Sequence, residues 1–479
     1  MDDGGVGVPI GSWRDLLSAG RRPTVAVLCG GVLLFATDTY VTASLLPSAV
    51  AEIGGERFYA WVTTVYLLTA VVASALVGRL LAAWPARRAY VLALAAFGVG
   101  AAIDAAAPDM AVLLVGRAVQ GVGGGLLAGL AYALIRTALP RRLWTRASAS
   151  ISTMWGVGLL VGPTLGGVFA EAGQWRLAFV ALVVITVAIG AGVPAGLRHT
   201  AAAPSGASGP FPLASVLLVA AAAAVLSVSG LAVSGSGVTG RGIAVAAGGL
   251  VVALLLLGGL VVVEHRPGGG GGRVLPAATF LRGGGLGAVY VLIGVLVGVS
   301  AVEVFVPLFG QRLGGLEPVT AGFLGVALAC GWVVGEVVSA SVGRARVCVT
   351  LGPAVTVLGF VALAVSQRAD ASTVTVLVWA ISLAAAGAGV GVAWPHLSAG
   401  ALAVGSGAED ADAGDGEGDR ASAAITMVQM LAVALGASFA GVAVALGADP
   451  LASAHLLYGG LGAVAVLGAV AALRARRAV

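Results

Sequence analysis

Fourteen runs of mostly apolar residues dominate this chain of 479 residues. Each run is about 20 residues long, which is the length that an α-helix needs to cross the hydrocarbon core of a bilayer. Only 10% of the residues are charged, whereas soluble domains carry about 25%. These features argue against a soluble enzyme, a nucleic-acid-binding protein and a disordered chain, and they predict an all-α membrane protein with 14 transmembrane helices. The predicted helices span approximately residues 24–46, 58–80, 88–107, 112–134, 150–170, 176–196, 212–233, 241–263, 286–308, 318–342, 347–367, 374–398, 421–446 and 452–473.

The arginines indicate how these helices are oriented. All 26 basic residues are arginine, and positively charged residues concentrate in cytoplasmic loops. When both termini are placed in the cytoplasm, 20 arginines fall in cytoplasmic segments, five fall on the outer side and Arg117 lies inside a span. We therefore expect a multi-pass protein of the cell membrane with an even number of spans and both termini in the cytoplasm. The first run lacks the character of a cleaved signal peptide.

Two polar linkers separate groups of runs. The linker at residues 264–285 contains five consecutive glycines, which predict a flexible loop. The linker at residues 406–420 holds six acidic residues, but Gly414 stands where an EF-hand calcium loop would need a ligand after Asp410 and Asp412. Since no nucleophile–base or metal-ligand spacing occurs elsewhere, we predict no catalytic residue, no metal site and no cofactor.

Ionisable residues inside the spans are the candidate functional groups, because charge is costly in a bilayer. The chain has no lysine and arginine does not deprotonate in proteins, so a proton carrier must be Asp, Glu or His. Asp38 and Glu303 lie near mid-membrane in the first and ninth predicted helices, where either can take up a proton on one side and release it on the other. Glu336 lies closer to the cytoplasm and is a candidate proton exit or cation contact.

Other interpretations of the polar and aromatic residues in the spans remain open. Asp38 can form a structural bond with Arg117 or with a neighbouring hydroxyl. Asp104, near the outer end of the third predicted helix, is expected at the membrane interface, and His396 is expected to serve a helix terminus. Five aromatic side chains can line a cavity, or serve packing and interfacial roles: Phe35, Tyr40, Tyr66, Trp155 and Trp332.

One face of the fourth predicted helix carries an arginine, a glutamine and two glycines. Arg117, Gln120, Gly121 and Gly124 follow the spacing i, i+3, i+4 and i+7, which places them on the same side of a helix. The small residues admit a neighbouring helix or a substrate close to the backbone. Because facing lipid is prohibitive for an arginine, we expect Arg117 to face the bundle interior.

The fifth predicted helix carries a stripe of glycines. Gly158, Gly162 and Gly166 recur every four residues, with Gly167 and Pro163 beside them. Small residues at this spacing allow close helix contact, and proline removes a backbone hydrogen bond and bends the helix. A helix of this kind suits a moving contact between two halves of a bundle, although plain tight packing explains the same pattern.

These motifs resemble those of the major facilitator superfamily. GRAVQGVGGG resembles its fourth-helix motif, and GVGLLVGPTLGG resembles the fifth-helix motif associated with antiporters. In the same order, DTYVTASLLP, Trp175–Arg176, VEHR and VPLFGQRLGGLEPVTAG are similar to motifs of the fourteen-helix drug:proton antiporter family. The resemblance extends from about residue 24 to residue 473.

The loop between the second and third predicted helices departs from the family pattern. Gly78 and the pair Arg87 and Arg88 remain, but Ala82 and Ala83 stand at the positions of the family's acidic and basic residues. In the family this loop is thought to latch one conformation through charge contacts. The departure therefore affects the latch that the family would predict here, but it does not affect the predicted fold.

The resemblance implies two six-helix bundles, residues 24–196 and 286–473, with two inserted helices at residues 212–263. Each bundle would contain inverted three-helix repeats around a central cavity that opens alternately to each side. The implied activity is proton-coupled efflux of small amphipathic drug-like or antibiotic compounds by a monomer that resides in the lipid bilayer. A proton symporter and an exporter of lipids or envelope components remain alternatives on the same fold.

Overall fold

The computed structural model describes most of the chain. The described residues are 12–55, 58–198, 212–230, 232, 239–265, 274–281, 285–316, 318–403 and 416–476. The five consecutive glycines of the first linker and most of the acidic linker lie outside these residues. The expectations of a flexible glycine loop and of an acidic linker without an EF-hand calcium site therefore stay predictions there.

The described residues form α-helices and short 3₁₀ turns, with no β-strand among them. Side-chain caps begin some of these helices, because Asp109 accepts a hydrogen bond from the Val112 amide and Asp449 accepts one from the Ala452 amide. The α-helices are α1 (Trp13–Leu16), α2 (Arg22–Ile53), α3 (Tyr59–Ala75), α4 (Val77–Ala83), α5 (Ala86–Ala105), α6 (Met110–Ala138), α7 (Trp144–Glu171), α8 (Trp175–Gly196), α9 (Leu213–Gly230), α10 (Gly240–His265), α11 (Leu286–Ser300), α12 (Val306–Gly314), α13 (Pro318–Ser339), α14 (Ala345–Ser366), α15 (Thr373–Ala403), α16 (Gly416–Ala445) and α17 (Pro450–Ala475).

Eleven of the described helices are long and apolar enough to cross a bilayer. The pair α3 and α4, bent by 49° at its break, makes a twelfth candidate if it forms one span. Large apolar side chains are exposed on the surface, and Leu255 of α10 and Val365 of α14 are 70% and 76% exposed. Apolar exposure on this scale is typical of a surface that faces lipid. The chain is thus an all-helical membrane protein with eleven or twelve candidate spans.

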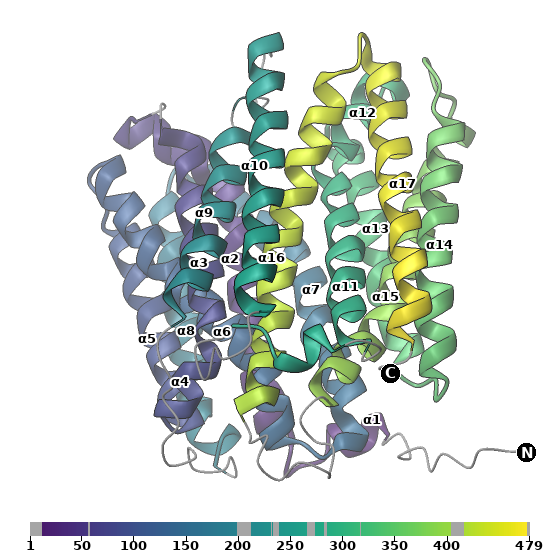
Figure 1. The fold of residues 1–479 in the computed structure, drawn as a ribbon. Coiled ribbons are helices and arrows are strands. Elements are labelled where there is room, and N and C mark those ends of the chain that lie inside the picture. Colours follow the sequence, from purple (N-terminus) through teal and green to yellow (C-terminus); the bar gives the residue numbers. More distant parts are fainter. Residues whose placement is uncertain are drawn as a thin grey trace, which may run out of the picture.

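Two groups of helices stand side by side, α2–α8 in the first half and α11–α17 in the second half (Figure 1). In the first half, α2 packs on α7 and α8, and α6 packs on α3 and α5. The second half repeats this pairing, since α11 packs on α16 and α17, and α15 packs on α13 and α14. Two helix groups with the same internal contacts therefore make up most of the protein.

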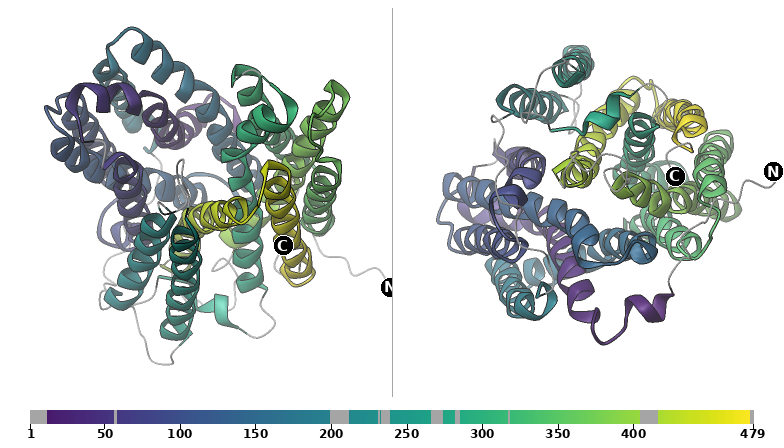
Figure 2. Two further views of the ribbon diagram at one scale, coloured as in Figure 1. Left: turned by 90° about the horizontal axis from the view of Figure 1, so that it is seen from above. Right: turned by 60° about the horizontal axis from the view of Figure 1, so that its bottom comes forward.

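Helices α9 and α10 pack on each other at the edge of the two halves (Figure 2). They contact α3 of the first half and α16 of the second half, so the pair spans the junction between them. Helix α1 and the C-terminal end of α17 lie at the same end of the assembly, which we name the terminal end (Figure 1).

The ninth predicted helix, residues 286–308, is broken in the structure. Helix α11 ends at Ser300, a 3₁₀ turn covers Ala301–Val304, and α12 begins at Val306. Pro307 explains the break, because a proline has no backbone N–H to donate and its ring clashes with the carbonyl of residue i−4, here Glu303. The sequence prediction of one continuous helix is therefore wrong at this position.

Glu264, at the end of α10, anchors the chain that follows the inserted pair. Its carboxylate accepts hydrogen bonds from the Ser215 hydroxyl of α9 and from the backbone amides of Val274 and Leu275, both at 3.1 Å. Its side chain is only 1% exposed. The described part of the predicted flexible loop is thus held in place by backbone hydrogen bonds to a buried carboxylate.

Candidate functional site

A buried ion pair lies at the centre of the first half. Asp38, midway along α2, accepts hydrogen bonds at 2.9 and 2.8 Å from Nη1 of Arg117 on α6. The two side chains are 0% and 1% exposed. Charges that are enclosed in a low-dielectric interior need a partner of opposite sign. Asp38 and Arg117 therefore neutralise each other, which is the structural bond that the sequence left open for Asp38.

Further polar contacts complete this site. Gln120 accepts a hydrogen bond from Arg117 at 2.6 Å and donates one from its amide to Asp38 at 3.1 Å. The guanidinium of Arg117 also lies 4.0 Å from the centroid of the Tyr66 ring, a cation–π contact. The hydroxyl of Thr42 lies 3.5 Å from Asp38, one helical turn further along α2. We name Asp38, Arg117 and Gln120 the polar triad.

The glycines of α6 allow this approach of three helices. A Cβ on Gly121 would lie 2.3 Å from the carbonyl oxygen of Tyr66 on α3, and a Cβ on Gly124 would lie 2.5 Å from the Phe35 ring of α2. Any larger side chain would push α2 and α3 away from α6. The predicted common face of Arg117, Gln120, Gly121 and Gly124 is present, and it meets neighbouring helices in all four cases.

Four of the five predicted cavity aromatics lie in two clusters, one in each half, and Tyr40 belongs to neither. In the first, Phe35 stacks on Tyr66 with ring centroids 5.5 Å apart and meets the edge of Trp155 at 5.2 Å. In the second, the rings of Trp332 and Trp394 lie 6.0 Å apart. Phe35 and Tyr66 are fully buried, so these two pack the core.

Glu336 of α13 lies at the contact between the halves. Its carboxylate accepts a hydrogen bond from the Trp332 indole at 2.7 Å and another at 3.3 Å from the hydroxyl of Thr153, which belongs to α7 of the first half. The side chain is fully buried. Separation of the two halves would break the bond to Thr153, so the surroundings of this carboxyl depend on the conformation.

Glu303 lies in the 3₁₀ turn between α11 and α12 and is half-buried. No hydrogen bond or ion pair holds its carboxylate among the described residues. Tyr40 of α2, two residues after Asp38, lies within electrostatic range of Glu303. A carboxylate at a break in a helix resembles the sites at which transporters use discontinuous helices.

The structure separates the remaining polar candidates. His396 is buried inside α15 rather than at the end of that helix, and its Nε2 lies 3.0 Å from the carbonyl oxygen of Ser339 at the end of α13. Asp104 lies one residue before the end of α5, and its side chain is fully buried inside the protein; its expected place at the membrane interface stays a prediction. The described residues contain no group of three or more His, Cys, Asp or Glu side chains that could hold a metal ion.

Sequence reasoning did not identify Glu52, which binds two residues of the motif before α8. Its carboxylate accepts hydrogen bonds from the Trp175 indole at 2.7 Å and from the Arg176 guanidinium. These two donors lower the pKa of Glu52, with the Trp175 bond as the larger cause. Arg176 also donates to the carbonyl of Ala107 at 2.9 Å, so it joins α2 and α8 to the turn after α5 at the end opposite the terminal end. No spacing pattern marks Glu52, because its partners are more than 120 residues away.

The glycine stripe of α7 faces α2 of its own half rather than the second half. A Cβ on Gly158 would lie 2.6 Å from the Cβ of Ala36, and a Cβ on Gly162 would lie 2.5 Å from the Cβ of Tyr40. Helix α7 runs unbroken through Pro163. The stripe therefore brings α7 against the part of α2 that carries Asp38, and the expected moving contact between halves is not made by these glycines.

We expect Gly162→Ala to destabilise the protein by about 1–3 kcal/mol, the usual cost of overpacking a closed contact. Gly166 is a similar position, because a Cβ there would lie 2.7 Å from the carbonyl oxygen of Val41. Gly167 is the matched control, since no atom lies within 4 Å of a Cβ there. Thermal unfolding in detergent would compare Gly162→Ala with Gly167→Ala. Equal melting temperatures would contradict the tight contact.

The two arginines that remain in the degenerate loop motif lie at the surface. Gly78 lies in α4, and Arg87 and Arg88 are exposed in the first turn of α5. Neither arginine has an acidic partner among the residues that the structure describes.

Hydrogen bonds between the halves lie towards the terminal end. Ser341, after α13, accepts hydrogen bonds from the Trp13 indole of α1 at 3.2 Å and from Arg146 of α7 at 3.4 Å. Thr426 of α16 donates to the carbonyl of Ala128 on α6 at 3.4 Å. Together with the Thr153–Glu336 bond, these contacts hold the halves together on this side.

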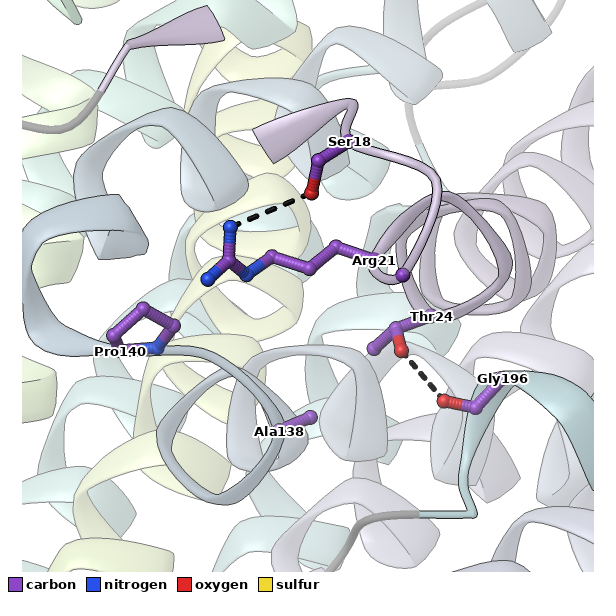
Figure 3. A pocket seen from close by; sticks show the side chains of 7 residues that line it. Ser18, Arg21, Thr24, Ala138, Pro140 and Gly196 are labelled. Carbon is purple, nitrogen blue, oxygen red and sulfur yellow. Dashed lines mark hydrogen bonds between the residues drawn. The ribbon is translucent and has the colours of Figure 1, made fainter. Parts of the chain in front are cut away.

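A pocket of about 510 Å³ opens at the terminal end, between the turn before α2 and the ends of α6 and α8 (Figure 3). Its lining includes the Arg21 guanidinium, which donates to the Ser18 hydroxyl at 3.4 Å, and Thr24, which donates to the Gly196 carbonyl at 2.6 Å. The lining holds no carboxylate and none of the predicted site residues. This pocket is therefore separate from the polar triad.

A set of apolar helices that encloses an ion pair, with two halves of matching helix contacts, defines a multi-pass membrane protein built from a repeated bundle. Comparison with known families identifies the family of this membrane protein. The model of the Major Facilitator Superfamily matches residues 28–437, and the chain belongs to this superfamily. It is accordingly a membrane transporter and not an enzyme.

Relatives and solved structures agree with this assignment. The chain is 45% identical over 372 residues to a probable multidrug-efflux transporter of Mycobacterium tuberculosis, covering 75% of this chain and 76% of the relative. It is 29% identical over 180 residues to multidrug resistance protein 3 of Bacillus subtilis, covering 37% of this chain and 34% of that protein.

The fold is shared with transporters of known structure. The human organic anion transporter MFSD10 superposes with a TM-score of 0.63 at 18% identity, over 94% of this chain and 99% of that chain. The proton:xylose symporter XylE superposes with a TM-score of 0.60 at 14% identity, over 95% of each chain.

Proposed function

We propose that this protein is a proton-coupled antiporter that exports small amphipathic drug-like or antibiotic compounds from the cell. The polar triad carries the proposal, because it encloses a protonatable carboxylate with an arginine that a proton would release. Kinship with probable multidrug-efflux transporters supports export and the class of substrate. The substrate, protons and the bilayer are then the partners of a monomer.

We further propose the fourteen-helix arrangement with both termini in the cytoplasm. If α3 and α4 form one bent span, there are twelve candidate spans, and the shorter apolar segments Leu213–Leu226 and Phe323–Ser339 bring the set to the predicted fourteen. The repeated helix contacts support bundles at residues 24–196 and 286–473, and the contacts of α9 and α10 support a separate pair at residues 212–263. The hydrogen bonds near the terminal end then close the cytoplasmic side.

The proposed cycle uses the two halves in turn. A proton that reaches Asp38 neutralises the carboxylate and leaves Arg117 without its partner, which destabilises the arrangement of α2 and α6. The surroundings of Glu336 change when the halves separate. Glu303 provides a further protonatable carboxyl in the second half. One proton entering the cell releases about 2.3 kcal/mol per 100 mV and about 1.4 kcal/mol per pH unit. Exchange of one monovalent cation for one proton moves no net charge, so only the pH gradient contributes to it. Export of a cationic substrate would therefore benefit from two carboxyls that carry two protons.

The direction of transport and its coupling are tested in inverted membrane vesicles. A panel of neutral and cationic compounds is offered under an imposed proton gradient, with proton release recorded in parallel. We expect accumulation inside the vesicles that collapses when an ionophore removes the gradient. Accumulation that does not respond to the ionophore would exclude proton coupling. In whole cells, an ionophore should raise the substrate content for an exporter, whereas it should lower that content for a symporter.

A further inference from the structure

Asp104 is a buried carboxyl that the cycle described above does not use. It lies at the end of α5 away from the terminal end, its side chain is fully buried, and neither carboxyl oxygen has a hydrogen-bond partner in the described part of the chain. It faces α6 at the residue before Arg117, since a Cβ on Gly116 would lie 2.1 Å from its Oδ1. An enclosed carboxylate without a partner is far more costly than a neutral carboxylic acid. Asp104 therefore carries a proton in this conformation.

The charged groups that act on Asp104 belong to the polar triad. Arg117 lies within electrostatic range of both Asp104 and Asp38, and these are the charged groups that act on Asp104. From α8, which also packs on α5, Arg176 is already bound to Glu52 and to the Ala107 carbonyl. One arginine thus acts on two carboxyls, and it is bonded to only one of them.

We propose that Asp104 is the outer member of a two-carboxyl proton relay that shares Arg117 with Asp38. In the first state Asp104 is protonated and Arg117 pairs with ionised Asp38. The proton then passes from the carboxyl of Asp104 to the carboxylate of Asp38, and Arg117 shifts to the newly ionised Asp104. Asp38 later releases the proton to the cytoplasm, and Asp104 takes up another from the outer side. Each state contains one arginine, one carboxylate and one carboxylic acid, so the transfer keeps the net charge of the site constant.

This relay rests on the proposed proton coupling, and its test uses Asp104→Asn in proteoliposomes. Asparagine imitates the protonated acid in shape but delivers no proton. We expect proton-driven transport to fall by about 100-fold, the scale of losing a positioned proton donor, while substrate exchange without a gradient stays near the wild-type rate. Azide, a small weak acid that carries protons to a site without its donor, should restore part of the lost transport. Thr186→Val, on the α8 face that packs against α5, is the control and should leave both rates unchanged.

The outcomes separate the relay from the proposed function. Wild-type rates in Asp104→Asn, or a loss that azide does not relieve, would overturn the relay while proton coupling stands. Wild-type transport without any proton dependence would overturn the proposed function itself. If Asp104→Asn does not reach the membrane, infrared spectroscopy of wild-type protein labelled at aspartate carboxyls replaces it. The relay predicts a protonated-aspartate band in wild-type protein and its loss in Asp38→Asn, where Arg117 is free to pair with an ionised Asp104. Absence of the band from the wild-type spectrum, or its persistence in Asp38→Asn, overturns the relay.

Discussion

Asp38→Asn is expected to abolish proton-driven transport. Asparagine cannot bind or release a proton, and its amide cannot balance the charge of Arg117, which is 1% exposed. Removing one member of a buried ion pair costs about 3–5 kcal/mol because the other charge stays enclosed. Transport of a fluorescent substrate into inverted vesicles under an imposed proton gradient measures the effect.

The double variant Asp38→Asn with Arg117→Gln separates coupling from folding. It removes both charges and keeps hydrogen-bonding groups beside Gln120, so we expect it to regain much of the lost stability but none of the coupled transport. Thr42→Val is the matched control, since its hydroxyl lies at 3.5 Å from Asp38 and contributes little. Export at the wild-type level by Asp38→Asn would eliminate Asp38 as the coupling residue.

The sequence predicted the polar triad in part. The spacing of Arg117, Gln120, Gly121 and Gly124 defines a helix face, and charge in a bilayer must turn inward, so an inward cluster follows from local rules. Asp38 could be chosen as the partner of Arg117 because few other acidic residues lie inside the predicted spans. The fully buried position of Asp104 did not follow, because burial near a helix end depends on how α5 packs against Gly116 of α6.

The misassigned features are those set by contacts between distant segments. Glycine spacing on α7 predicted a close helix contact, but periodicity does not say which neighbour fills it, and the neighbour is α2. The Thr153–Glu336 bond joins residues on different halves, and no pattern in either helix points to the other. The break before α12 was predictable in principle from Pro307, whose ring is incompatible with a regular helix there.

Glu336→Gln is expected to stop transport while preserving binding of substrate from the outer side. In the closed arrangement the glutamine oxygen can accept the Trp332 indole bond, and its amide can donate to Thr153. The hydrogen bonds of the closed state are therefore retained. In wild-type protein, loss of the Glu336 proton creates a carboxylate whose burial between the halves disfavours closure. Glutamine cannot form this charge, so the variant lacks that effect. The closed cytoplasmic contact should become more populated, and we expect transport to fall by about tenfold for each 1.4 kcal/mol of added closure.

Distances between spin labels on exposed residues of the two halves measure this population shift. Glu336→Gln should keep the labels at their closed distance across the pH range over which wild-type protein opens. Thr153→Val supplies the opposite variant, because it removes one hydrogen bond that exists only when the halves are in contact, worth about 0.5–1.5 kcal/mol. Opening of Glu336→Gln with the same pH dependence as wild-type protein would contradict a role for this carboxyl in closure. If protonation of Glu336 controls closure, Glu336→Gln should favour the closed state and Thr153→Val the open state. An equal shift of both variants towards the open state would show instead that the contact is purely structural.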